Sequence, residues 1–147
     1  MNYWLIKSEP DCFSIDDLKK KGVEPWSGVR NFQARNYMRD GMKVGDLALF
    51  YHSSTNPTGV YGIAKVASKP HPDVTAKDPK DEHYEPKAEW VCVDMKFVKK
   101  LAKPVTLDEI KRDPKLKGIL VAKTGQRLSI MPVEERHYRR IVEMSEK

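Results

Sequence analysis

Residues 47–66, LALFYHSSTNPTGVYGIAKV, decide the fold class. The two ends of this stretch, residues 47–51 and 60–66, are apolar runs with aromatic and β-branched side chains, a composition typical of buried strands. Between them, residues 52–59 contain Ser, Thr, Asn, Pro and Gly, which favour turns. We therefore expect two strands joined by a loop.

Three more strands are predicted on either side of this pair. Residues 3–8, YWLIKS, place every second side chain on the same face of a short strand. Residues 89–101, EWVCVDMKFVKKL, show the same alternation, and residues 127–131, RLSIM, are expected to form the last strand. The chain is therefore rich in strands.

Helix signals separate these strands. Ser14 and Asp17 have the spacing of a capping box, and Gly22 is placed to end the helix that they begin. Thr106 and Glu109 form a second capping box ahead of a short helix. These local signals predict two helix starts.

Two further helices are expected from weaker patterns. Residues 31–42 place Phe32, Tyr37 and Met38 on one apolar side, and Pro132 is expected to start a C-terminal helix. In the resulting order, strands outnumber alternating strand–helix units, which disfavours a doubly wound parallel sheet. We expect an α+β fold, a small curved mixed sheet or barrel with helices packed against it.

Length and charge limit the possible functions. The 147 residues fit one domain spanning residues 1–147. There are 27 Lys and Arg against 21 Asp and Glu, a net charge of +6 that permits a nucleic-acid partner without requiring one. No apolar run approaches the roughly 18 residues of a membrane span, and no signal peptide is recognisable. We expect a cytoplasmic monomer without a membrane partner.

The residues that usually carry metal or nucleophilic chemistry show no known spacing. Cys12 and Cys92 form no CxxC pair, so we expect two reduced thiols and no structural zinc. His71 and His83 lie in a proline-rich loop, residues 68–88, and match neither HExxH nor an EF-hand. Neither a GxSxG elbow nor a glycine-rich phosphate loop is present. No metal or cofactor is expected.

Aromatic and amide side chains beside arginines are more informative. Trp26 lies in a predicted Pro/Gly loop, residues 23–30, where an indole is either a plug over the core or a stacking surface for a flat ligand. Residues 30–36, RNFQARN, offer guanidinium groups that suit phosphate and amides that suit base edges. The alternative is an ordinary solvated helix face.

Polar residues also follow the strand of residues 47–51. Tyr51, His52 and Ser53 end this apolar run, and polar groups at the end of a buried strand often line a cleft. Tyr and His also cap cores routinely, so both interpretations stay open.

Several stretches resemble, in order, the motifs of the EVE domain family. Residues 3–10, YWLIKSEP, are similar to its opening motif, residues 26–38, WSGVRNFQARNYM, to its second block, and residues 45–53, GDLALFYHS, to its third. Residues 90–94 and 127–133 continue the match, so the resemblance covers nearly the whole chain.

This resemblance implies a PUA-like fold, a strongly curved β-barrel surrounded by helices. It also implies a non-enzymatic role, the binding of modified bases in nucleic acid, especially modified cytosines of DNA such as 5-methylcytosine. The base would be extruded from the stack and held against an aromatic side chain.

The resemblance also assigns roles to individual residues. The implied base-binding residues line an aromatic pocket around one indole: Ser8, Trp26, Asn31, Tyr51, His52 and Ser53. The implied phosphate-binding residues are basic: Lys7, Arg30 and Arg35.

Two other functions remain open at this point. One keeps the fold and changes the ligand to modified or structured RNA, as in other PUA-like domains. The other is a hydrolase or nuclease acting on modified nucleotides, with Glu9, Asp46 and Asp94 as its candidate carboxylates.

Overall fold

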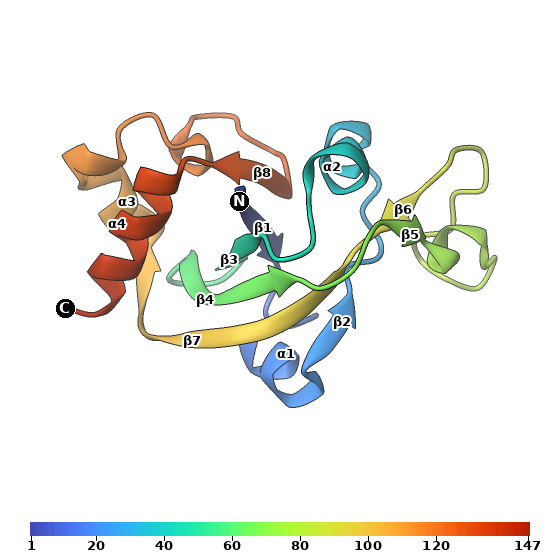
Figure 1. Ribbon diagram of the computed structural model, residues 1–147, viewed down its shortest axis with the longest axis horizontal. Helices are drawn as coiled ribbons and strands as arrows, with labels where there is room; N and C mark the ends of the chain where they lie inside the picture. Colours follow the sequence, from blue (N-terminus) through green and yellow to red (C-terminus); the bar gives the residue numbers. More distant parts are fainter.

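The computed structural model describes residues 1–147 and contains a six-stranded sheet and a separate two-stranded sheet (Figure 1). The six strands of the large sheet are, in chain order, β1 Tyr3–Ser8, β2 Val23–Pro25, β3 Leu47–His52, β4 Gly59–Val66, β7 Asp94–Thr106 and β8 Ile130–Val133. The small sheet consists of β5 His71–Pro72 and β6 Val91–Cys92.

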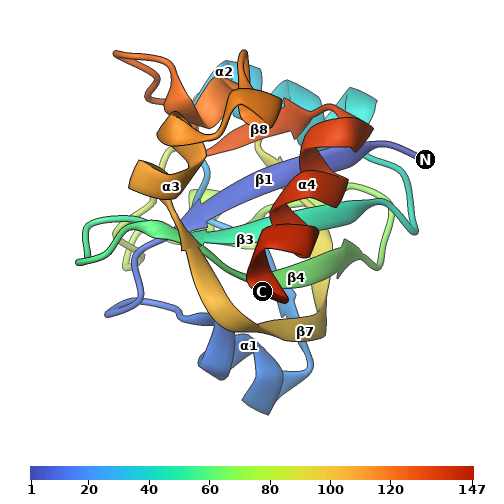
Figure 2. The same cartoon turned by 90° about the vertical axis from the view of Figure 1, so that its left-hand side faces the viewer.

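The helices lie around the large sheet. They are α1 Ile15–Lys21, α2 Phe32–Asn36 with its π-helical continuation η1 Tyr37–Gly41, α3 Leu107–Arg112, α4 Glu135–Ser145 and the 3-10 turns η2 Val74–Lys77, η3 Pro114–Leu116 and η4 Leu120–Ala122. The pair α3 and α4 lies at one end, and the small sheet lies at the opposite end (Figures 1 and 2). None of the helices combines the length and the apolar character that a membrane crossing requires.

The strand order of the large sheet is β2-β7-β4-β3-β1-β8. Only β1 and β3 run parallel, while every other neighbouring pair is antiparallel. The pairing of β4 with the 13-residue strand β7 shifts register twice, and such irregularities bend a sheet. The predicted curved mixed sheet with helices around it is therefore confirmed.

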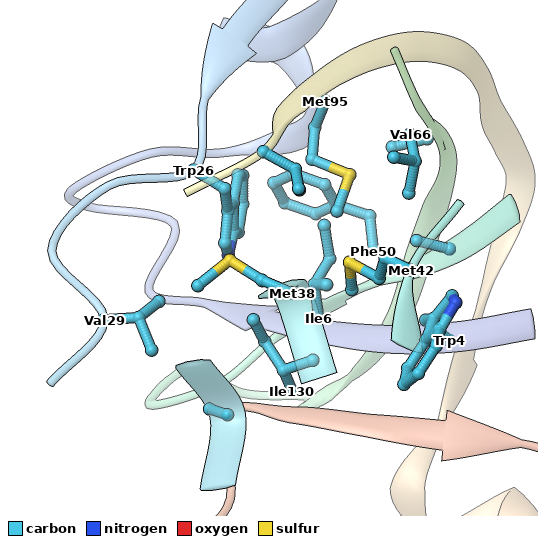
Figure 3. Packing of buried hydrophobic residues seen from close by; sticks show 14 of the residues in the cluster. Trp4, Ile6, Trp26, Val29, Met38, Met42, Phe50, Val66, Met95 and Ile130 are labelled. Carbon is cyan, nitrogen blue, oxygen red and sulfur yellow. The ribbon is translucent and has the colours of Figure 1, made fainter. Parts of the chain in front are cut away.

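The sheet divides the buried side chains into two clusters. Along β1, Trp4 and Ile6 enter one cluster and Leu5 enters the other, because successive side chains of a strand alternate. The first cluster, part of which Figure 3 shows, is covered by α1, α2 and the loop that carries Trp26. The second cluster is covered by α3, α4 and the turns between α3 and β8.

The local helix signals are confirmed. Ser14 and Asp17 form the predicted capping box of α1, and Gly22 ends that helix with a φ of 83°. Thr106 and Glu109 form the capping box of α3. These motifs need only neighbouring residues, which is why the sequence predicts them well.

Four predictions of secondary structure need correction. Residues 23–25 form strand β2 rather than loop, because the first part of β7 offers them a free edge. The predicted strand 89–101 breaks at Val93, whose carbonyl accepts from Trp26 N at 2.8 Å. Pro132 lies inside β8, on an edge strand where its missing N–H is tolerated. Phe32 is 56% exposed and points away from the core, which α2 reaches through Ala34.

Candidate binding site

A pocket of about 320 Å³ opens where β1 ends and the loop after β2 begins. This volume is near the lower limit of roughly 300 Å³ for small-ligand sites. The lining residues come from four separate parts of the chain: Lys7, Ser8, Cys12, Phe13, Glu24, Pro25, Trp26, Ser27, Gly28, Val29, Arg30, His83 and Ser129. The pocket is therefore a product of the tertiary fold.

Backbone hydrogen bonds fix the walls of the pocket. Lys7 N donates to Ser129 O at 2.8 Å, which ties the end of β1 to the segment before β8. Gly28 adopts a φ of 84°, and its N–H donates to Asp73 Oδ2 at 2.9 Å. A side chain at Gly28 would meet the ring of His83 at 3.1 Å, so this ring lies directly against the loop.

Trp26 forms one wall and belongs to the first core cluster. Its ring packs edge-to-face on Phe50 at 5.5 Å and on Phe13 at 6.2 Å between centroids. Only 8% of the residue is exposed, and Figure 3 shows its indole among the buried side chains. Most of the indole surface is therefore already covered by the core, and a ligand in the pocket meets the remainder.

Asp73 is the centre of a hydrogen-bond network behind this wall. Its buried carboxylate accepts from Gly28 N and from Arg30 Nη1 at 3.0 Å, and from Thr75 N at 3.0 Å. Burial by itself raises the pKa of Asp73, but the hydrogen bonds from Thr75 and Gly28 and the Arg30 guanidinium outweigh it, so the pKa is lowered. The network holds the loop of residues 68–88 against the loop that carries Gly28 and Arg30.

The two basic residues that line the pocket differ in whether their positive charge has a carboxylate partner. Arg30 donates to His83 O, Val29 O, Asp73 and Thr75, so four of its five N–H groups are in use. Lys7 has no carboxylate within 4 Å, and burial lowers the pKa of its ammonium group. Arg30 therefore mainly connects its own loop to the loop of residues 68–88, whereas the Lys7 ammonium group is available to bind an anionic ligand.

The structure brings four of the nine predicted site residues together at this pocket. These are Lys7, Ser8, Trp26 and Arg30. The Ser8 hydroxyl already donates to Phe13 O, which leaves its oxygen as an acceptor.

The other five predicted residues do not line it, and each has a local role instead. Asn31 caps α2 by accepting from Ala34 N at 3.0 Å, and Arg35 donates to Glu89 O at 2.9 Å. Tyr51 is buried in the second cluster, and buried His52 accepts from Ile15 N at 3.1 Å. Ser53 follows β3, and its N–H donates to Ser8 O at 3.0 Å.

Nine of the 13 lining residues were not among the predicted site residues. Of these, Glu24 lies in a segment expected to be loop, Ser129 in the predicted strand 127–131, and His83 in the proline-rich loop. The hydrogen bond from Arg30 Nε to His83 O, across 53 positions of sequence, brings His83 to the pocket. No spacing in the sequence signals that contact.

The groups considered for catalysis are engaged elsewhere. The Cys92 Sγ lies 3.8 Å from His71 Nδ1, but burial raises the pKa of the Cys92 thiol to about 12, so it stays protonated at neutral pH. Asp46 is buried and accepts from Trp4 Nε1 at 3.0 Å and from Lys43 N at 2.9 Å. No three side chains of His, Cys, Asp or Glu are grouped to hold a metal ion.

Comparisons with known proteins agree with this architecture. Human thymocyte nuclear protein 1 is 36% identical over an alignment of 169 positions, which covers 99% of this chain and 75% of that protein. A crystal structure of a Pseudomonas syringae protein matches with a TM-score of 0.92 at 40% identity, covering 97% of this chain and 99% of the other.

A second solved structure includes a ligand. Human THYN1 protein in complex with 5-methylcytosine containing DNA matches with a TM-score of 0.91 at 34% identity, covering 100% of this chain and 99% of that chain. The predicted PUA-like fold is confirmed by these matches. The sequence model of the EVE domain matches residues 2–144, and the chain therefore belongs to the EVE domain family.

Proposed function

We propose that this chain is a nucleic-acid-binding protein that takes one modified base of DNA, a modified cytosine such as 5-methylcytosine, into the pocket beside Trp26. The observation that carries the proposal is the pocket itself, a small cavity in which an indole wall and the uncompensated ammonium group of Lys7 meet. The human relative in complex with 5-methylcytosine containing DNA supports the same ligand class.

The lining suits a flat polar ligand that carries a phosphate nearby. Trp26 and Phe13 supply aromatic surface, and Ser8 Oγ supplies an acceptor for an amino group of a base edge. Lys7 supplies a positive charge for a phosphate group of the DNA backbone. A base reaches such a cavity only after leaving its stack, which costs a few kcal/mol that the pocket contacts must offset.

We propose binding without chemistry on the base. The Cys92 thiol lies 3.8 Å from His71 Nδ1, and its pKa of about 12 keeps it from acting as a thiolate. Of the carboxylates considered for a hydrolase, Asp46 accepts three N–H groups and Asp94 pairs with His71 at 2.9 Å. Their roles are structural in this interpretation.

The proposal is tested by fluorescence anisotropy with two labelled duplexes of one sequence, with and without 5-methylcytosine. We expect tighter binding of the modified duplex by the wild type and reduced discrimination by Trp26→Phe, which shrinks the pocket wall but keeps it aromatic. Trp26→Ala is unsuitable, because truncating a buried Trp costs about 3–5 kcal/mol of stability.

The matched control is Trp4→Phe, the same change at another buried tryptophan that does not line this pocket. Discrimination should be unchanged in Trp4→Phe. Equal affinity of the wild type for both duplexes would refute the preference for modified cytosine, and preferential competition by single-stranded RNA would favour the RNA alternative.

A further inference from the structure

An exposed aromatic stack lies on the surface next to the pocket. The ring of Phe32, the first residue of α2, stacks on the ring of Trp90 with centroids 4.9 Å apart and planes 20° apart. Phe32 is 56% exposed, whereas Trp90 is only 5% exposed. The buried Trp90 ring thus covers one face of the Phe32 ring, and the rest of the Phe32 ring is exposed to solvent.

Arg35 stands at the side of this stack and leaves the outer face of Phe32 free. Its guanidinium carbon is 4.9 Å from the Phe32 centroid and 5.6 Å from the Trp90 centroid. With the rings themselves 4.9 Å apart, the three centres form a nearly equilateral triangle, so Arg35 cannot cover the face of Phe32 opposite Trp90.

The guanidinium of Arg35 is fixed in place but its charge is not compensated. It donates to Glu89 O at 2.9 Å and to Asn36 Oδ1 at 3.0 and 3.1 Å, and no carboxylate lies within 4 Å. Three of its five N–H groups are used, which leaves two for a phosphate.

The stack is continuous with the pocket through Arg30. The Arg30 guanidinium lines the pocket and also lies 5.4 Å from the Trp90 centroid. A path of touching groups therefore runs from the pocket through Arg30 and Trp90 to Phe32. Phe32 is the exposed end of a row of neighbouring groups that begins at the pocket.

We propose that Phe32 is a second stacking surface, on which the base adjacent to the pocketed base stacks while Arg35 holds the intervening phosphate. The proposal rests on the function proposed above and adds a second base contact to it. Aromatic rings accept any base face, so this contact supplies affinity and holds the strand in register without reading sequence. The rigid support from Trp90 and Arg35 lowers the entropy cost of placing the ring.

The test combines a protein change with a DNA change. Wild type and Phe32→Leu are compared on a duplex containing 5-methylcytosine, and on the same duplex with an abasic site beside the modified base. We expect Phe32→Leu to lose about tenfold affinity on the intact duplex, the magnitude typical of one base stack. The abasic site should cost the wild type a similar factor and cost Phe32→Leu much less, because both changes remove the same contact.

Val44→Ala, which trims another exposed apolar side chain outside this stack, is the matched control and should bind as the wild type does. Thermal melts of all variants separate folding from binding. If the wild type binds and Phe32→Leu binds equally well, or loses the same factor on both duplexes, the second stacking surface is overturned while the pocket stands. If the wild type binds neither modified nor unmodified duplex, the proposed function fails and the stacking surface fails with it.

Discussion

Asp73 organises the pocket although it does not line it. Its carboxylate is buried, yet it joins the pocket loop at Gly28 to the 68–88 loop at Thr75 and neutralises Arg30 between them. A buried carboxylate is costly unless it is paired and hydrogen-bonded, and here both conditions are met. The same group therefore stabilises the fold and sets the position of a pocket wall.

The ionisation of Asp73 predicts a pH dependence of stability. Because its pKa in the folded protein is lowered, its contribution is complete above the unfolded value of about 3.9 and is lost as the pH falls through the folded pKa. We expect Asp73→Asn to lower the free energy of unfolding by about 1.5–3 kcal/mol at pH 7. Urea unfolding at a series of pH values should show this difference shrinking below about pH 4. A difference that stays constant down to pH 3 would contradict the role given to this carboxylate.

At the scale of elements, the helix α1 lies so close to β4 that no side chain fits between them. A Cβ atom at Gly62 would lie 2.4 Å from Ile15 Cδ1 and 2.8 Å from Lys99 O. These distances are far below normal contact, and Lys99 O is backbone that cannot move aside easily. The close approach holds α1 against the sheet beside Phe13 and thus near the pocket.

Gly62→Ala should therefore destabilise the protein by about 1–3 kcal/mol, the usual cost of overpacking a core. The measurement is chemical denaturation of Gly62→Ala, Ile15→Ala and the double variant. Because Ile15→Ala removes both Cγ1 and Cδ1, the two side-chain atoms that a Cβ at Gly62 would meet, the double variant should lose less stability than the sum of the two single variants. Strict additivity would show that the Ile15 side chain is not what Gly62 accommodates.

At the scale of the whole molecule, the basic side chains behind the net charge of +6 differ in whether they have a carboxylate partner. Many basic side chains pair with nearby carboxylates, among them Arg30 with Asp73 and Arg140 with Asp113. Lys7 and Arg35 have no such partner, and both lie in or beside the aromatic groups of the site. Two of the basic side chains without a carboxylate partner thus lie where the proposed DNA backbone would pass.

This distribution predicts the salt dependence of DNA binding. Each phosphate contact contributes about −0.9 to the slope of log K against log salt concentration. Lys7→Gln should therefore weaken binding on all sequences and reduce the magnitude of this slope by about 1. Lys111→Gln, an equal change of charge on α3, should leave the slope unchanged. Binding titrations between 50 and 200 mM salt check both values, and equal slopes for Lys7→Gln and the wild type would exclude a phosphate contact at Lys7.

Features that depend only on neighbouring residues were predicted best. Both capping boxes and the alternating strand of residues 3–8 are confirmed. The strand at residues 23–25 and the position of Pro132 depend on which strand edges are free, and these predictions were wrong. In the site, the family resemblance predicted Trp26 as a pocket residue. His83 reaches the pocket through a long-range hydrogen bond with Arg30, and no sequence pattern predicts such a contact.

The tie between Lys7 N and Ser129 O joins parts of the pocket that are more than a hundred positions apart in the chain. Cutting the polypeptide anywhere between these positions leaves two fragments, and neither contains all the residues that line the pocket. A ligand that fills this cavity is therefore thermodynamically linked to global unfolding rather than to local fraying. At one hundred times its Kd, such a ligand raises the free energy of unfolding by about 2.7 kcal/mol.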